Sequence, residues 1–503
     1  MRRGGVVKHL AASGSALAFA LTAVPAQADT LQDALTGAYL NNPTLEAARA
    51  NLRATDETVQ IERSAGLPSA DATVVATEFL RQSDLNRAFS PDRALTAGVD
   101  LGVPIYSGGA VKNSVRAAEE RVQAGRADLR GTESAIFSRV VAAYMDVLRG
   151  QALVALSANQ VDVLGVNVQA SSDRFEIGDL TRTDVAQSQA RLAVAQGDLR
   201  SAQANLIAAR EDYIALVGEA PTDLQAPPPL PGLPADVATA VDIALQDNPD
   251  LIAARERAAA SGYDVEVAGS GRLPRVSVFA GYDYQNFLGT NPDRVLDPND
   301  PTVPLLPADQ TTAAAQAGVS LRVPLFQGGR PAALQRQATA RATAALEEVI
   351  AAERETIAQV RSAYSSWQAS LAIIESSQSA VDAAALSLEG VRAENSIGNR
   401  TILDVLNAEQ ELLSSRVQLV TARRNAYVAG FSLLAAMGRA EARDLGLGDE
   451  GVLYDPVANY ERVSGSIWDW DRDPAPSATT RSTADIPAAT AAIPEIAEPG
   501  VSP

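Results

Sequence analysis

The sequence repeats its own pattern at a nearly constant spacing, which limits the chain to folds made of two similar units. The segment VPIYSGG begins at Val103, and VPLFQGG begins at Val323, 220 residues later. Nearer the start of each half, NNPTLEAARANL from Asn41 matches DNPDLIAARERA from Asp247 at a spacing of 206 residues. Self-similarity at a fixed spacing is typical of a duplicated structural unit. The sequence therefore predicts two copies of one unit in the 503-residue chain.

The two units are expected to differ by one loop. The spacing between matching residues rises from 206 to 220 between Pro274 and Gly318, so the second unit has 14 more residues there. The segment GTNPDRVLDPNDPTVPLLPADQ lies in this interval and is rich in Pro and Asp, which is loop composition. We expect an elongated loop over about residues 287 to 310.

Alternating apolar and polar residues flank this loop. Val276, Val278 and Tyr282 precede the loop, and Val319 and Leu321 follow it. Within each group, neighbouring members are two or four positions apart. A period of two residues predicts strands with one apolar face, and the first unit has the same alternation over residues 97–105. Four strands cannot close a barrel alone, because about eight are needed. A membrane barrel shared by several chains and the edge of a soluble sandwich both fit this pattern.

Long helices are predicted after each Gly-Gly pair. Apolar residues there recur at spacings of three and four: Phe137, Val140, Tyr144 and Val147, and in the second unit Ile357, Val360, Tyr364 and Trp367. An average step of 3.5 residues favours supercoiled helices. If Arg149-Gly150 and Ala369-Ser370 mark turns, each unit is a helical hairpin whose second arm of about 65 residues is roughly 100 Å long.

The Gly-Gly pairs are expected to turn the backbone between strand and helix. Gly108 and Gly109 occupy this place in the first unit, and Gly328 and Gly329 occupy it in the second. Glycine adopts positive φ angles at little cost, which such a turn requires. A phosphate-binding loop fits poorly, because neither segment has the G-x-x-x-x-G-K-[ST] pattern.

Two Thr-x-x-Asp pairs are expected to cap helices. Asp184 follows Thr181 by three residues, and Asp404 follows Thr401 in the same way. This spacing is that of a capping pair at a helix start. Metal binding or catalysis is the alternative, but each Asp would need a second carboxylate nearby, and the repeat places the two in separate halves.

The ends of the chain and the join between its halves have distinct compositions. Residues 1–28 have a basic start, an apolar run and a final Ala-Gln-Ala, which predict a cleaved signal peptide. The first repeat covers residues 29–218, a Pro-rich linker covers 219–236, and the second repeat covers 237–440. Residues 441–503 form an extension that we expect to be largely disordered. Within this extension, Trp468 and Trp470 precede a tail rich in Pro, Ala, Ser and Thr that starts at about Ala475, and they are either membrane-interface residues or an exposed pair.

Composition excludes several classes of function. The chain has no Cys, and its one His, His9, lies in the signal. The mature chain therefore lacks Ser-His and Cys-His catalysis and the usual zinc and haem ligands, and we expect no catalytic site, cofactor or metal. A formal net charge of −19 argues against binding nucleic acid. We find no stretch of about 20 apolar residues after the signal, which argues against a helical membrane span.

The repeated motifs together resemble the TolC-like family of outer-membrane efflux and type I secretion channels. The resemblance covers roughly residues 29 to 440, and its most specific parts are FEIGDLTRTDVAQSQARL, NSIGNRTILDVLNAEQEL and the two Val-Pro-x-aromatic-x-Gly-Gly junctions. It implies a mainly α fold with membrane β-strands, in which a homotrimer forms a 12-strand β-barrel continued by a periplasmic α-helical barrel. Asn395 departs from the pattern, because the first unit and the family have an aromatic residue there.

The resemblance implies an outer-membrane channel-tunnel of a tripartite efflux or type I secretion system. Its partners would be outer-membrane lipid, a periplasmic adaptor and an inner-membrane pump, and it would not be an enzyme. A periplasmic coiled-coil adaptor is the alternative, but it leaves the two strand pairs unexplained. A carboxylate-dependent hydrolase is a third, and no segment is left over for its pocket domain.

Two sets of residues are candidates for channel function. Asp162, Asp382 and Glu389 would each form a ring of three in a trimer, and acidic rings constrict pores and favour cations. A solvated helix face is the alternative for them. The predicted hairpin tips at Arg149, Gly150, Ala369 and Ser370 are candidates for adaptor docking.

Overall fold

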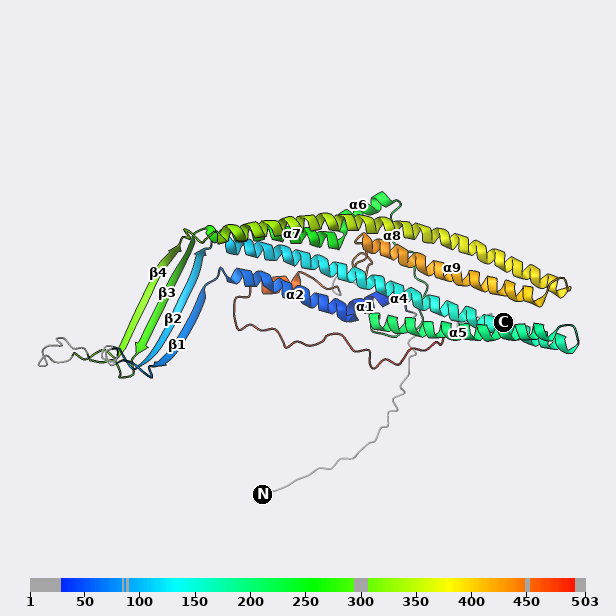
Figure 1. The fold of residues 1–503 in the computed structure, drawn as a ribbon, viewed down its shortest axis with the longest axis horizontal. Helices are drawn as coiled ribbons and strands as arrows, with labels where there is room; N and C mark the ends of the chain where they lie inside the picture. The colour runs from blue at the N-terminus through cyan, green and yellow to red at the C-terminus, as the bar shows by residue number, and fades with distance from the viewer. Residues whose placement is uncertain (1–28, 84–85, 87–89, 294–305, 448–452, 494–503) are drawn as a thin grey trace, which may run out of the picture.

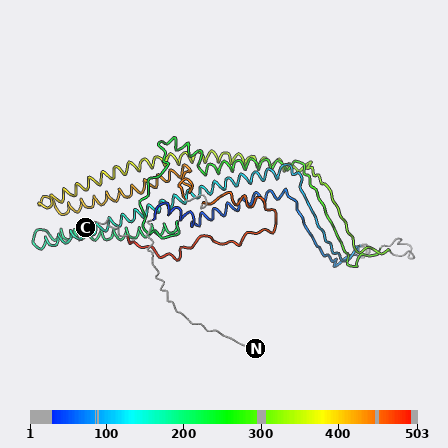
Figure 2. The backbone as a smooth tube through the Cα atoms, turned by 180° about the vertical axis from the view of Figure 1, so that it is seen from behind, coloured from blue at the N-terminus to red at the C-terminus, as the bar shows by residue number. Residues whose placement is uncertain are grey.

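The protein is an elongated molecule with a small β-sheet at one end and long helices over the rest (Figure 1). The computed structural model describes residues 29–83, 86, 90–293, 306–447 and 453–493. The predicted signal peptide, residues 1–28, and much of the predicted elongated loop lie outside these ranges. The backbone trace in Figure 2 shows the four strands at one end of the molecule, inclined to the long helices that form the rest.

The two halves have the same order of elements. The first unit comprises α1 (Leu31–Asn41), α2 (Pro43–Ser64), β1 (Ser69–Glu78), β2 (Arg93–Tyr106), α4 (Ala110–Glu176) and α5 (Arg182–Val217). The second comprises α6 (Val237–Asp247), α7 (Pro249–Gly269), the short 3₁₀ helix η1 (Ser270–Arg272), β3 (Arg275–Asn286), β4 (Thr311–Arg322), α8 (Arg330–Ser396) and α9 (Ile402–Ala436). A short helix, α10 (Ala458–Val463), follows.

The repeated Asn-Pro pair joins the two ends of each unit. Asn42 caps α2, and its side-chain nitrogen donates to the carbonyl of Leu216 near the end of α5, at 2.9 Å. Asn248 caps α7 and donates to the carbonyl of Ala436 at the end of α9, at 3.0 Å. Proline follows each cap because its fixed φ suits the first position of a helix. The motif therefore fixes where each unit closes on itself.

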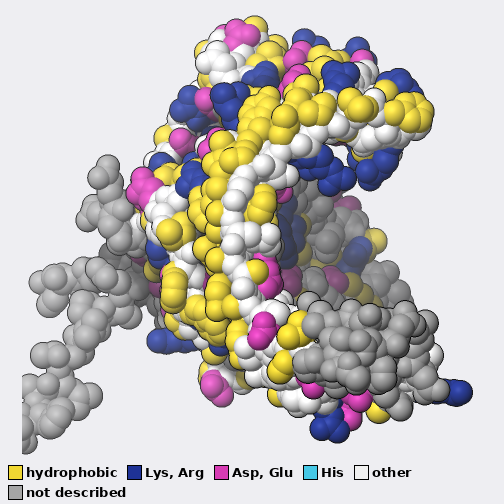
Figure 3. Space-filling view, turned by 90° about the vertical axis from the view of Figure 1, so that its left-hand side faces the viewer, with side chains coloured by type: hydrophobic (Ala, Val, Ile, Leu, Met, Phe, Trp, Pro, Cys, Tyr) yellow, Lys and Arg dark blue, Asp and Glu magenta, His cyan; other side chains and the backbone are white. Residues whose placement is uncertain are grey.

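The sheet is antiparallel in the order β1-β2-β3-β4, and its register gathers the apolar residues on one face. Ala72, Val99, Tyr282 and Ala315 pair in one row across the four strands. The neighbouring row of Asp71, Asp100, Gly281 and Gln316 lies on the other face and is polar. Viewed from the sheet end, hydrophobic side chains form a band along the strands (Figure 3). The predicted one-sided strands are present, and β1 and β4 form the edges.

Glycine turns the chain from strand to helix at both predicted places. Gly108 and Gly109 have φ of 67° and 82° just before α4, and Gly328 and Gly329 have 59° and 80° just before α8. Ordinary residues rarely adopt these angles. A Cβ on Gly108 would lie 2.8 Å from the Cβ of Leu273, so close packing adds to the demand for glycine there.

The hairpin turns do not lie where the sequence predicted them. Arg149 and Gly150 lie inside α4, and Ala369 and Ser370 lie inside α8, while the chain reverses at residues 177–181 and 397–401. The first arm of each hairpin is therefore the long one, with 67 residues and a length of about 100 Å. Gly150 instead lets two helices approach, since a Cβ there would lie 3.1 Å from Leu206 of α5. The sequence prediction therefore placed a helix end at a glycine that lies inside a helix.

The middle of α4 forms the core. Phe137, Val140, Tyr144 and Val147 are completely buried there, among side chains of both units. Among the described residues, α4 is the one helix that is long and apolar enough, by length and composition, to cross a membrane. The sequence had been expected to contain no stretch of about 20 apolar residues after the signal. The central side chains of α4 are buried in the core, and a core helix can pass the same test of length and composition.

The extension after residue 440 contacts the helices along the part that is described. In α10, Asn459 donates to the buried carboxylate of Asp56 in α2, at 2.8 Å. Farther on, Arg210 of α5 donates to the carbonyls of Thr490 and Ala492. The sequence predicted a largely disordered extension, whereas these contacts attach described parts of it to the helices. Main-chain carbonyls make several of them, and such contacts leave no pattern in the sequence.

Candidate functional site

The helix-end turns of the two hairpins share one construction. Gly178 and Gly398 have φ of 83° and 81°, and the helices α5 and α9 start four residues later. The hydroxyl of Thr181 accepts from the Asp184 main chain at 3.3 Å, and the Asp184 carboxylate accepts from the Thr181 main chain at 2.9 Å. Such a pair satisfies two main-chain donors at the helix start.

The second unit repeats this capping box with Thr401 and Asp404, at 3.3 and 2.9 Å. Hydrogen bonds from the capping threonine lower the pKa of each aspartate carboxyl. Both carboxylates are therefore already used by the caps, as the sequence predicted. Among the described residues, no group of three or more Asp, Glu, His or Cys side chains could hold a metal ion.

A buried glutamate connects the two hairpins near these turns. Glu409 of α9 is 3% exposed, and Asn167 of α4 donates to both of its carboxylate oxygens, at 3.1 and 3.0 Å. Arg392 of α8 donates to the same carboxylate at 2.9 Å. The carboxylate thus has a neutral partner in the first hairpin and a charged partner in the second. We call these three residues the Glu409 link.

Apolar and exposed polar contacts accompany the Glu409 link. Leu164 of α4, Ala195 of α5 and Leu406 of α9 form a small buried cluster between the hairpins. Arg191 of α5 also donates to the side chain of Asn407 in α9, at 3.1 Å. Near the turns, the two hairpins are therefore joined by the buried Glu409 link, by the exposed hydrogen bond between Arg191 and Asn407, and by this small apolar cluster. Few contacts join the hairpins here, and such regions open at low free-energy cost.

Sequence reasoning missed the Glu409 link because it searched for residues that match between the repeats. At the repeat spacing of 220 residues, Glu409 corresponds to Gln189, Asn167 to Ser387 and Arg392 to Ser172. None of the three matches. The available signal was an acidic residue among the apolar positions of α9, where Val405 and Leu412 are buried.

The candidate acidic residues lie on the surface of the single chain. Asp162 in α4, Asp382 in α8 and Glu389 in α8 are all exposed. Asp382 accepts from Gln378 at 3.0 Å within its own helix. It lies 14 residues before the end of α8 at Ser396, or roughly 20 Å along the helix. The structure does not bring the three side chains together within the chain.

The candidate docking residues also fall far from the turns. Arg149 pairs with Asp146 at 3.4 Å, and Asp146 in turn bonds Arg424 of α9 at 2.6 Å. This part of α4 contacts both α5 and α9. Ala369 and Ser370 lie mid-helix in α8. The hairpin tips are instead the turns that begin at Ile177 and Ile397, and both of these side chains are exposed.

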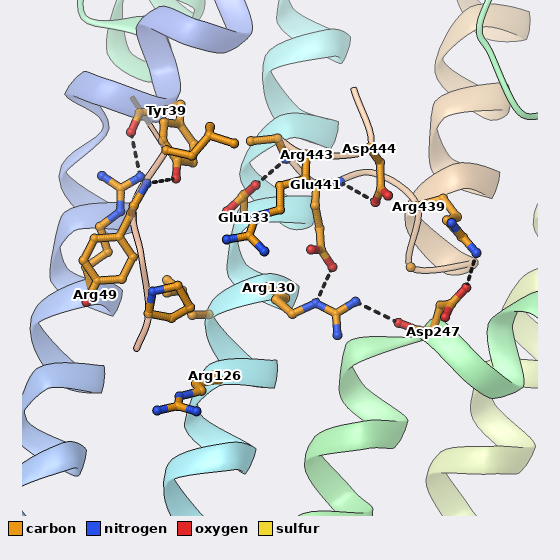
Figure 4. A pocket seen from close by; sticks show the side chains of 16 residues that line it. Tyr39, Arg49, Arg126, Arg130, Glu133, Asp247, Arg439, Glu441, Arg443 and Asp444 are labelled. Atoms are coloured by element: carbon orange, nitrogen blue, oxygen red, sulfur yellow. Dashed lines mark hydrogen bonds and ion pairs between the residues drawn. The ribbon is translucent and has the colours of Figure 1, made fainter. Parts of the chain in front are cut away.

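A second polar cluster lies where α1, α2, α4, the end of α6 and the segment after α9 meet (Figure 4). It surrounds a cavity of about 370 Å³. Arg130 of α4 bonds Glu441 at 2.6 Å, and Arg439 bonds Asp247 at 2.6 Å. The charges are mostly paired across it, so the cluster holds the segment after α9 against α4.

Glu133 is the least solvated acid of this cluster. Its carboxylate accepts a hydrogen bond from the main chain of Ala442. The pKa of Glu133 is raised to about 7, mainly by burial; the hydrogen bond from Ala442 opposes this shift, and the nearby Glu441 adds to it. Burial also raises the pKa of Glu441, although Arg130 opposes that shift. The Glu133 carboxyl therefore binds a proton near neutral pH.

Comparison with known proteins matches both units. The model of the outer membrane efflux protein family matches residues 34–219 and 240–439. The chain belongs to the outer membrane efflux protein family. It is 32% identical over 448 residues to the outer membrane efflux protein BepC of Brucella suis, covering 88% of this chain and 92% of that protein. It is 27% identical to the outer membrane protein TolC of Vibrio cholerae, over 83% of this chain and 92% of TolC.

Solved structures of outer-membrane channels have the same fold. The Campylobacter jejuni CmeC outer membrane channel matches with a TM-score of 0.70 and 17% identity, over 86% of this chain and 89% of CmeC. The outer membrane protein VceC of Vibrio cholerae matches with a TM-score of 0.67 and 23% identity, over 81% of this chain and 96% of VceC. These likenesses concern the fold alone.

Membership of the outer membrane efflux protein family confirms the resemblance, the location in the outer membrane and the export function expected from the sequence. The family consists of transport proteins. The alternative of a periplasmic adaptor is set aside, since both units match a family of channels. In this chain the helix-end turns lie at the end of the molecule farthest from the sheet (Figure 1), and the Glu409 link lies close to them in α4, α8 and α9.

Proposed function

We propose that three copies of the chain form one conduit, with a 12-strand barrel in the outer membrane and a helical tunnel through the periplasm. The conduit serves a tripartite efflux or type I secretion system, and the pump selects the cargo. The observation that carries this proposal is a four-stranded sheet with one apolar face that continues through glycine turns into helices about 100 Å long.

The sheet supports the closure of a barrel by several copies. Its apolar row of Ala72, Val99, Tyr282 and Ala315 suits contact with lipid, and its polar rows suit contact with water. Its edges are β1 and β4. An open edge in lipid leaves main-chain donors and acceptors unpaired, which costs several kcal/mol for each group. Pairing β4 of one copy with β1 of the next removes every edge.

The helices support the same assembly. Along α8 the apolar side chains of Leu346, Ile350, Leu371 and Leu386 are exposed. An exposed apolar stripe of this length is typical of a protein–protein contact. We assign it to the neighbouring copy, which closes the helical tunnel.

The far helical ends serve as gate and docking place in this account. The Glu409 link holds the two hairpins of one copy together, and release of the hairpins from each other widens the tunnel. The periplasmic adaptor contacts the turns at residues 177–181 and 397–401 and shifts the ends to the open arrangement. Asp162, Asp382 and Glu389 form acidic rings that favour cations at the narrow end.

Cysteine cross-linking tests the assembly, because the natural chain has no Cys. Ala72→Cys in β1 is combined in turn with Ala313→Cys, Ala315→Cys and Ala317→Cys in β4, which samples neighbouring registers on one face. Oxidation of membranes should give covalent trimers for at least one pair. Ala72→Cys alone is the matched control and should give no species larger than a dimer. Monomers from every pair would contradict the shared barrel.

A further inference from the structure

Two exposed tryptophans lie in the segment that follows α10. Trp468 and Trp470 are 71% and 72% exposed, and the adjacent Ile467 is 75% exposed. Large apolar side chains are normally buried, and a cluster of exposed ones marks a contact with another molecule or a membrane. Neither the core nor the Glu409 link uses these residues.

The segment is tied firmly to one end of α2. The side chain of Gln60 donates to the carbonyl of Ser466 at 2.6 Å, and Arg63 donates to the carbonyl of Ser464 at 2.7 Å. A turn follows, in which the main chain of Asp471 donates to the carbonyl of Trp468 at 3.0 Å. The tryptophans are therefore presented by a fixed loop rather than by a free tail.

Its attachment places the loop beside the junction of helices and sheet. Gln60 and Arg63 belong to the last turn of α2, which ends at Ser64, and β1 begins at Ser69. Figures 1 and 2 both show the chain after α10 reaching toward the strands before it turns back. The sheet, with its apolar face, therefore begins close to the end of α2 that holds the loop.

Other exposed apolar side chains lie at the same end of the strands. Ile105 and Tyr106 end β2, and Leu325 and Phe326 follow β4, and all four are exposed. Aromatic residues gather at both borders of a membrane, where their rings sit at the level of the lipid headgroups. The loop with Trp468 and Trp470 continues this group of side chains from the strands onto the helical part.

We propose that residues 467–470 insert Trp468 and Trp470 into the headgroup region of the inner leaflet of the outer membrane. The proposal rests on the proposed function, because it places the sheet in that membrane. Asp469 and Asp471 make the loop acidic, so the aromatic rings rather than attraction to anionic lipid supply the binding. The loop thereby gives each copy a second attachment beside its strands, which fixes the helical part upright on the membrane.

Tryptophan quenching in vesicles tests the insertion. The full chain with Trp367→Phe is reconstituted into phosphatidylcholine vesicles, so that Trp468 and Trp470 are its emitters. The matched control carries Trp468→Phe and Trp470→Phe and retains Trp367, which lies 37 residues into α8, roughly 55 Å from the start of that helix. Each protein is compared in ordinary lipid and in lipid brominated near the headgroup.

We expect brominated lipid to remove most of the emission of the Trp468 and Trp470 pair and to leave the emission of Trp367 unchanged. Equal emission in both lipids, together with full quenching of the pair by aqueous acrylamide, would overturn the insertion. Channel conductance measured in the same vesicles separates the two proposals. Conductance without quenching contradicts the tryptophan anchor alone, and a protein that neither inserts nor conducts contradicts the conduit itself.

Discussion

Asn167 of α4 donates hydrogen bonds to both carboxylate oxygens of Glu409 in α9, at 3.1 and 3.0 Å, and so connects the first hairpin to the second. The acceptor is 3% exposed. A hydrogen bond to a charged group contributes about 1.5–3 kcal/mol, and a buried charge that loses a partner costs more than the bond alone. A single substitution at Asn167 can therefore remove one of the contacts that join the two hairpins near their turns.

Asn167→Ala should loosen the ends of the hairpins. The substitution leaves the Glu409 carboxylate with Arg392 as its remaining side-chain partner, and we expect the far ends of α4 and α9 to open more easily by about 1–3 kcal/mol. Hydrogen exchange of main-chain amides near residues 164–176 and 402–410 measures this. Gln189→Ala is the matched control, because Gln189 is the exposed counterpart of Glu409 in the first unit. Equal exchange in both variants would refute the link.

Neutralising the acidic surface residues should change ion preference. Asp382→Asn and Glu389→Gln together remove six negative charges from a trimer, so the ratio of cation to anion permeability should fall toward one. Reversal potentials across a salt gradient measure this ratio. Asp382→Glu retains the charge and should retain the preference. An unchanged ratio in the neutral variant would show that these side chains lie on a solvated face outside the conduction path.

Stability should depend on the protonation of Glu133. Burial raises its pKa from 4.5 to about 7 in the folded protein. The raised value means that folding favours the protonated acid, so this contribution is complete below about pH 4.5 and is lost as pH rises through about 7. The full difference corresponds to about 3 kcal/mol.

Thermal unfolding of the wild type and Glu133→Gln at pH 5 and pH 8 measures this contribution. Glutamine keeps an oxygen acceptor for the Ala442 main chain but does not titrate. The wild type should therefore lose more thermal stability than the variant between the two pH values. Identical losses in both proteins would assign the pH dependence to other groups.

The two strand-helix turns should tolerate alanine differently. At Gly108 a Cβ would lie 2.8 Å from the Cβ of Leu273, whereas at Gly328 a Cβ would meet nothing within 4 Å. Both positions have positive φ, which costs alanine about 1–2 kcal/mol. Overpacking at Gly108 adds about 1–3 kcal/mol. Gly108→Ala should therefore lower the melting temperature of the purified protein clearly more than Gly328→Ala. The reverse order would contradict the packing at this turn.

The repeat made much of the fold predictable. Matching positions predicted both strand pairs, the glycine turns and the capping boxes, because local backbone chemistry requires particular residues there. The position of the hairpin turns was not predicted. Gly150 looks like a helix end in sequence, and its role in the approach of α4 to Leu206 depends on a partner helix more than 50 residues away.

The candidate site was less predictable than the fold. The Glu409 link joins three helices through residues that differ between the repeats, so neither the repeat nor any local spacing marks it. The cluster around Glu133 also depends on burial by the segment after α9. Both sites are created by tertiary packing, which cannot be predicted from a pattern of residues along the chain.

Single-channel recording in a planar bilayer tests the conduit most directly, with the mass of the detergent-extracted protein measured alongside. The account predicts a stable trimer that gives discrete, cation-preferring current steps, and larger or more frequent openings for Asn167→Ala. A water-soluble protein that never forms trimers and gives no conductance would contradict it.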